Sequence, residues 1–129
     1  MGQVYNAYIK LKIIKNRRGK FADRGEIMDI QERISGRNVT LLLSGEADHH
    51  GVRGALLKID QIIDTALPRS LTLDLGGVTF MDSSGIALIL RSRQKMSLLD
   101  GNIQVKNIPT QARRVLDAAG INRIVSMKN

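Results

Sequence analysis

The sequence predicts an α/β fold in which a mixed, mostly parallel β-sheet packs against helices. Two observations support this prediction. Short segments with apolar residues at every second position, such as 39–43 and 71–75, alternate along the chain with segments whose apolar residues recur at helical spacing. The chain has 129 residues, of which 43% are hydrophobic but only 3% aromatic, so we expect one domain with an aliphatic core.

The first predicted element is a β-hairpin. Ile30 and Ile34 lie among polar residues, the segment 35–38 has turn composition, and the apolar segment 39–43 supplies the returning strand. The polar segment 44–51 that follows is predicted to be a loop.

A helix follows, with apolar residues at helical spacing, and it ends near Pro68, which cannot continue it. These apolar residues are Ala55, Leu56, Ile59, Ile62, Ile63 and Leu67. Alternating Leu residues then predict a strand over 71–75, with one well-buried face, and 76–80 lead to the turn 81–85.

The second half of the chain is predicted to continue the alternation of helices and strands. The segment 86–99 is strongly apolar in its first half, which predicts a buried helix that stops at 100–102. A strand is predicted around 103–105, and a helix over 109–120, opening on Pro-Thr and ending on Gly. The segment 121–127 leaves room for one short final strand.

Charge divides the chain into a basic N-terminal extension, 1–27, and a domain, 28–129. The extension holds seven Lys or Arg against two acidic residues, a net charge of +5, and the domain contributes only +3. The extension is predicted to be a flexible tail. The alternatives are a basic arm for an anionic surface and a nucleic-acid-binding segment, although no direct nucleic-acid partner is expected for the domain.

Composition excludes several classes of protein. Without cysteine the chain has no disulfide framework, no thiolate metal site and no cysteine nucleophile, which fits a cytoplasmic location. No apolar run approaches the ~20 residues that span a bilayer, so no membrane partner is expected.

Three kinds of chemical site, a metal site, a serine nucleophile and a nucleotide-binding loop, each lack residues that they require. His49 and His50 stand near two carboxylates, but adjacent residues point in different directions and the chain has no third histidine, so a polar connection is preferred to a metal site. Ser83 lacks the glycine spacing and the downstream histidine of an α/β hydrolase. The glycines do not form a Walker sequence. No enzyme activity, metal or cofactor is expected.

The turn 81–85 is the remaining candidate. Asp82, Ser83, Ser84 and Gly85 stand where a strand gives way to a helix, and there a carboxylate or hydroxyl can cap the helix or an added phosphate can be held. Considered as local chemistry alone, a capping turn is the commoner explanation.

Two separated motifs, 45–50 (Gly-Glu-Ala-Asp-His-His) and 80–85 (Phe-Met-Asp-Ser-Ser-Gly), together with Arg-Arg-Val-Leu at 113–116 and Gly120, give the chain its resemblance to a known family. From about Met28 to Met127 the chain resembles the anti-sigma factor antagonists. These are the small STAS-domain proteins of bacteria, among them the antagonists of the sporulation sigma F pathway. The resemblance implies a STAS-domain sandwich.

The resemblance also implies a function. In this family the first serine of Asp-Ser-Ser-Gly is phosphorylated by the anti-sigma factor, a serine kinase, and a phosphatase restores it. Carried across, Ser83 is the phosphoacceptor. Asp82, Ser84 and Gly85 shape the acceptor site, and Asp48 and His49 border the same partner-binding surface. The unphosphorylated chain is expected to bind the anti-sigma factor and free a sigma factor for transcription.

Two departures from the family pattern stand out, namely the basic extension and the absence of a further helix after the last strand. We expect the second to affect stability or a partner contact. A monomer or weak dimer is expected for a diffusible antagonist. The alternative is a STAS scaffold or sensor subunit of a larger regulatory assembly, for which a long N-terminal addition is natural.

Overall fold

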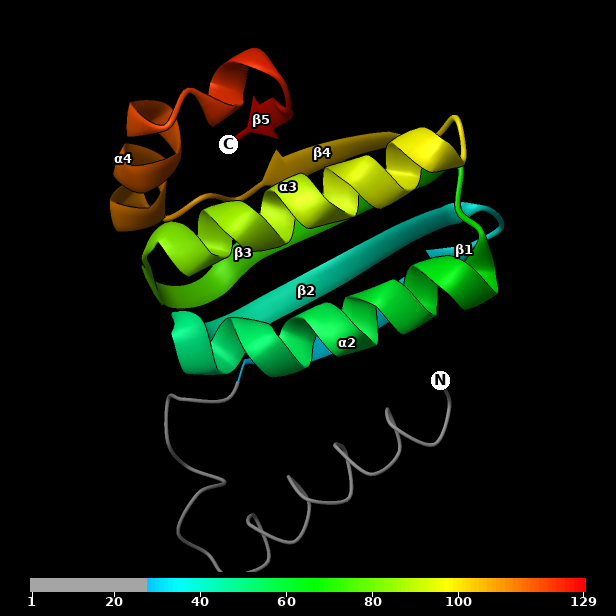
Figure 1. The fold of residues 1–129 in the computed structure, drawn as a ribbon, viewed down its shortest axis with the longest axis horizontal. Coiled ribbons are helices and arrows are strands. Elements are labelled where there is room, and N and C mark those ends of the chain that lie inside the picture. The colour runs from blue at the N-terminus through cyan, green and yellow to red at the C-terminus, as the bar shows by residue number, and fades with distance from the viewer. Residues whose placement is uncertain (1–27) are drawn as a thin grey trace, which may run out of the picture.

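The structure is a computed structural model that describes residues 28–129. The predicted N-terminal extension, 1–27, lies outside the described residues. The elements in chain order are β1 (Asp29–Ser35), β2 (Asn38–Ala47), α2 (His49–Ala66), β3 (Ser70–Met81), α3 (Ser83–Leu98), β4 (Asn102–Lys106), α4 (Thr110–Ala118), the 3-10 helix η1 (Ile121–Arg123) and β5 (Ser126–Lys128). Figure 1 shows α2 and α3 lying side by side across the sheet, with α4 beside the start of α3.

Residues 28–129 form one five-stranded sheet in the order β1-β2-β3-β4-β5. The hairpin strands β1 and β2 are antiparallel, and every other neighbouring pair is parallel. This confirms the predicted α/β class with a mixed, mostly parallel sheet. Each parallel connection needs a crossover, and the helices between the strands supply it.

Alternation along the strands gives the sheet one apolar face. Leu41 pairs with Leu73, which pairs with Val105, and all three side chains are fully buried. The next residues along the strands point to the opposite face, where Gln104 donates a hydrogen bond of 2.9 Å to the Thr72 hydroxyl. The core therefore lies between the apolar face and the helices, and it is aliphatic as predicted.

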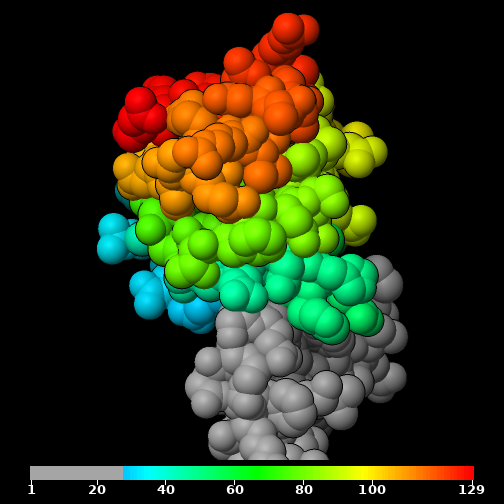
Figure 2. Space-filling view, turned by 90° about the vertical axis from the view of Figure 1, so that its left-hand side faces the viewer, coloured from blue at the N-terminus to red at the C-terminus, as the bar shows by residue number. Residues whose placement is uncertain are grey.

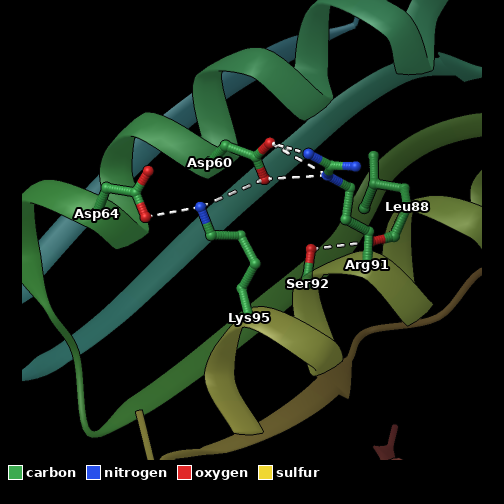
Figure 3. A network of polar contacts seen from close by, with 6 residues as sticks. All are labelled: Asp60, Asp64, Leu88, Arg91, Ser92 and Lys95. Atoms are coloured by element: carbon green, nitrogen blue, oxygen red, sulfur yellow. Dashed lines mark hydrogen bonds and ion pairs between the residues drawn. The ribbon is translucent and has the colours of Figure 1, made fainter. Parts of the chain in front are cut away.

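Ion pairs link the exposed flanks of α2 and α3 (Figure 3). Arg91 Nη2 lies 2.8 Å from Asp60 Oδ2, and Lys95 Nζ lies 2.6 Å from Asp64 Oδ1 and 4.0 Å from Asp60 Oδ1. The hydrogen bond and negative charge of Asp60 raise the pKa of the Arg91 guanidinium above its ordinary value. Within α3, the buried Ser92 hydroxyl donates to the Leu88 carbonyl one turn earlier, at 2.8 Å.

Several predicted boundaries were wrong. The predicted strand 71–75 continues to Met81, and residues 49–51 of the predicted loop 44–51 belong to α2. The segment 44–47 is not a loop, because β2 continues to Ala47 with register shifts on both sides of Gly45. The helix after the 81–85 turn begins at Ser83 and not at Ile86, because Asp82 caps it. The final strand is confirmed but short, since η1 occupies the first residues of 121–127.

The helices of residues 28–129 include none with the length and apolar character needed to cross a membrane.

Candidate phosphoacceptor turn

The turn between β3 and α3 holds four of the predicted site residues in one capped structure. Asp82 is the N-cap of α3, with extended backbone, and its Oδ1 accepts a hydrogen bond of 2.8 Å from the Ser84 amide. The Asp82 carbonyl accepts another, of 3.0 Å, from the Gly85 amide. The capping turn is therefore present, and Ser83, the first residue of the helix, is left exposed.

The start of α2 has the same construction. Asp48 is its N-cap, and its Oδ1 accepts a hydrogen bond of 2.9 Å from the Gly51 amide. His49 follows as the first helical residue and is exposed. Asp48 and Asp82, on two different connections, thus satisfy free amides of two helix N-termini.

Sheet register brings these two turns together. Ala47 pairs with Met81 in the parallel β2–β3 ladder, so Asp48 and Asp82 follow directly after paired residues. The Asp82 amide donates to the Ala47 carbonyl at 3.3 Å, which fastens one turn to the other. Figure 2 shows this face of the molecule, where the start of α2, the β3–α3 segment and α4 lie in successive bands. Asp48 and His49 therefore lie on the same face as Ser83.

The backbone is packed too closely here for larger residues. A Cβ on Gly85 would lie 2.5 Å from Met81 Cγ and 2.9 Å from its Sδ, and a Cβ on Gly51 would collide with the Glu46 carbonyl oxygen. Gly85 is thus part of the site because it lets α3 rest on the last residue of β3. A larger residue at position 51 would shift the start of α2, and one at position 85 would displace the Met81 side chain or the start of α3.

The sequence interpretation missed one residue that contacts this turn. Gln111, on α4, accepts a hydrogen bond from the Met81 amide and donates one to the Met81 carbonyl, both at 2.8 Å. A long polar side chain four residues before Val115, on the inner side of an amphipathic helix, is the only signal that the sequence offers.

The chemistry available at Ser83 is that of an exposed acceptor. Within residues 28–129 its hydroxyl has no side-chain hydrogen-bond partner, so no base of that region is placed to activate it as a nucleophile. The rings of His49 and His50 pack edge to face, with their centroids 5.7 Å apart. Within the described chain, no three His, Asp or Glu residues lie close enough together to hold a metal ion. A helix N-terminus does tolerate an added negative charge, because its amides and dipole favour anions.

Comparison with known proteins places these features in a family. The STAS domain model matches residues 28–129. The anti-sigma F factor antagonist of Lysinibacillus sphaericus is 30% identical over 90 residues, which cover 70% of this chain and 77% of that protein. The anti-sigma F factor antagonist of Paenibacillus polymyxa is 31% identical over 83 residues, which cover 64% of this chain and 71% of that protein.

Solved structures share the fold. Unphosphorylated SpoIIAA, an anti-sigma factor antagonist, matches with a TM-score of 0.68 and 24% identity, over 78% of this chain and 89% of its own. An anti-sigma factor antagonist from Mycobacterium paratuberculosis matches with a TM-score of 0.72 and 18% identity, over 80% of this chain and 86% of that chain. The phosphorylated form of the Bacillus SpoIIAA matches with a TM-score of 0.62 and 24% identity, over 78% of this chain and 92% of that chain. The chain belongs to the STAS domain family, among the anti-sigma factor antagonists.

Proposed function

We propose that this chain, in its unphosphorylated form, binds an anti-sigma factor that is a serine kinase, and that phosphorylation of Ser83 ends the binding. Binding would release a sigma factor for transcription. A serine phosphatase would return the chain to its active form. In this proposal the chain is a cytoplasmic regulator and not itself an enzyme.

The observation that carries the proposal is the position of Ser83. It is the exposed first residue of a capped helix, and the register of β2 and β3 sets the Asp48–His49 turn beside it. A kinase can reach an exposed hydroxyl on a rigid turn without unfolding the protein. We therefore assign partner binding to the surface formed by Asp48, His49, Asp82, Ser83 and Ser84, with Gly85 packed beneath it.

Charge and bulk explain how phosphorylation would end binding. A phosphate adds about −1.5 to −2 charges and three acceptor oxygens. It would stand next to Asp82, whose carboxylate caps α3, on the face that also carries Asp48. A central interface residue is often worth ~2 kcal/mol or more, so its loss lowers affinity by more than about tenfold.

Phosphate mapping tests the acceptor assignment. The full chain is incubated with a purified anti-sigma F serine kinase and ATP, and the modified residue is located by mass spectrometry. We expect phosphate on Ser83, none on the chain after Ser83→Ala, and modification retained after Ser84→Ala, the matched control. Phosphate on Ser84 or elsewhere, with Ser83 free, would contradict the proposal.

Binding is measured in parallel by isothermal titration with the same kinase. We expect Ser83→Ala to bind like the natural chain and Ser83→Asp to bind more than about tenfold more weakly. Equal affinity of the two variants for the kinase would contradict the proposal that phosphorylation of Ser83 ends binding.

A further inference from the structure

The end of β3 that leads into the phosphoacceptor turn extends past its neighbour β4. Strand β4 pairs with β3 only from Ser70 to Asp74. In the described chain the segment 75–81 therefore has no strand on its β4 side. Backbone amides and carbonyls that point to this side need other hydrogen-bond partners or water.

Gln111 supplies such a partner at Met81. Its side-chain amide accepts from the Met81 N–H and donates to the Met81 carbonyl, each at 2.8 Å. The two bonds have the same donors and acceptors as those that a neighbouring peptide group would make. Helix α4 thus replaces the missing strand at the one residue that precedes the cap of α3.

Met81 is also the residue on which the turn rests. Its buried side chain lies under Gly85, and it pairs with Ala47 on the β2 side. Gln111 holds its backbone from the opposite side. Displacement of Met81 would move Asp82 and, with it, the cap that fixes Ser83.

We propose that Gln111 is a positioning residue for the phosphoacceptor turn, and that it acts on Ser83 through the backbone of Met81. The proposal rests on the assignment of Ser83 as acceptor. It makes α4, which carries no acceptor residue, a second determinant of how Ser83 is presented to the kinase. Anything that shifts α4 would then alter the phosphorylation rate without touching Ser83.

Amide exchange, measured by NMR on the full unphosphorylated chain, tests the positioning without a kinase. The variant Gln111→Met keeps side-chain length and helix propensity but removes both hydrogen bonds. The matched control is Gln104→Met, which removes a side-chain hydrogen bond of 2.9 Å to Thr72, at the other end of β3. We expect the amides of Met81, Ser84 and Gly85 to exchange about tenfold faster in Gln111→Met and at the natural rate in the control. Equal rates at these amides in all three proteins would overturn the proposal.

A second variant protects the test against loss of folding. Gln111→Glu keeps the shape and one acceptor oxygen but has no donor for the Met81 carbonyl at neutral pH. We expect faster exchange at Ser84 and Gly85, with the Met81 amide protected by the retained acceptor and core amides such as Leu73 unchanged in both Gln111 variants. Faster exchange spread evenly over the core would indicate a purely global role and contradict positioning.

The kinase reaction then separates positioning from affinity. With a purified anti-sigma F serine kinase, we expect Gln111→Met to lower kcat for Ser83 phosphorylation about tenfold and to leave KM within about twofold. Unchanged kcat despite faster exchange would overturn a role in presenting Ser83. If the natural chain is not phosphorylated at Ser83, the proposed function fails, whereas the exchange rates still decide whether Gln111 fixes the turn.

Discussion

Asp82 combines a structural and an electrostatic role, and two substitutions separate them. Asparagine keeps the side-chain oxygen that accepts from the Ser84 amide, whereas alanine removes it. We expect Asp82→Ala to lower the free energy of unfolding by about 1 kcal/mol and Asp82→Asn to change it little. Urea unfolding followed by circular dichroism measures both. Equal losses in the two variants would mean that the charge, and not the cap, stabilises α3.

Gly85 tests the packing beneath the phosphoacceptor turn. Its Cβ would overlap the buried Met81 side chain, so we expect Gly85→Ala to destabilise the fold by about 1–3 kcal/mol, despite the better helix propensity of alanine. The measurement is urea unfolding.

The control for Gly85→Ala is a double-mutant cycle. Met81→Ala removes the atoms that a Cβ at position 85 would overlap. In that background, Gly85→Ala should lower the free energy of unfolding by about 1 kcal/mol less than it does in the natural chain. Strict additivity of the two substitutions would show that Gly85 is needed for a reason other than Met81.

Residue by residue, the sequence predicts the caps better than the contacts. Asp82 is recognisable because a carboxylate before an apolar helical segment is a local signal. Gln111 is not recognisable in this way, since its partner lies 30 residues earlier and the contact exists only once α4 has packed against the sheet. The adjacency of Asp48 and Asp82 likewise depends on the β2–β3 register.

At the scale of elements, α2 and α3 combine a buried contact with an exposed ion-pair network. Asp60 pairs with Arg91, whose side chain is 56% exposed, so solvent screens the interaction strongly. We expect Asp60→Asn to cost about 0.5–1 kcal/mol at low salt and less in 1 M salt, where the Debye length is about 3 Å. Urea unfolding at the two salt concentrations measures the difference. Asp117→Asn, which removes a carboxylate with no ion pair in the described chain, is the control, and its effect should not depend on salt in this way.

The same pair has a defined pH dependence. Asp60 raises the pKa of Arg91 in the folded state. The stabilisation by this ion pair is therefore fully present below the pKa that Arg91 has in the unfolded chain, and it is lost only as pH rises through the pKa that Arg91 has in the folded chain. Both pKa values lie far into the alkaline range. We therefore expect the difference between the natural chain and Asp60→Asn to stay constant from about pH 7 to about pH 10. A loss of the difference within that window would assign the effect to another group.

The elements that the sequence predicts least well are those that long-range pairing creates. Ser44 to Ala47 have little strand propensity, yet β2 continues through them because their backbone pairs with β3. Gly76 and Gly77 belong to β3 for the same reason, and a Cβ on Gly77 would lie only 2.6 Å from Ser44 Cβ. The amphipathic helices, by contrast, are predicted from local spacing, and the structure confirms them.

For the molecule as a whole, the sheet and the two capped helices position the turn that carries Ser83. The β2–β3 register and the Gln111 contact hold Met81, the last residue of β3, from its two sides. SpoIIAA in both its phosphorylated and unphosphorylated forms matches this fold. We expect a phosphate on Ser83 to change the surface and leave the architecture as it is, because the amides and dipole of a helix N-terminus favour added negative charge.

Ser83→Asp tests whether the switch acts without unfolding. At the first position of α3 the helix dipole favours the new charge by about 0.3–1 kcal/mol, and repulsion from the neighbouring Asp82 opposes it. We expect the free energy of unfolding to stay within about 1 kcal/mol of the natural value, and the amide spectrum to change only near residues 81–85 and 47–49. Urea unfolding and NMR measure these. Ser97→Asp, near the end of α3, is the matched control, because there the same charge meets the negative end of the dipole and should destabilise the helix by about 0.3–1 kcal/mol. A loss of several kcal/mol in Ser83→Asp, or shifts spread over the core, would mean that the switch works by unfolding and not by altering one surface.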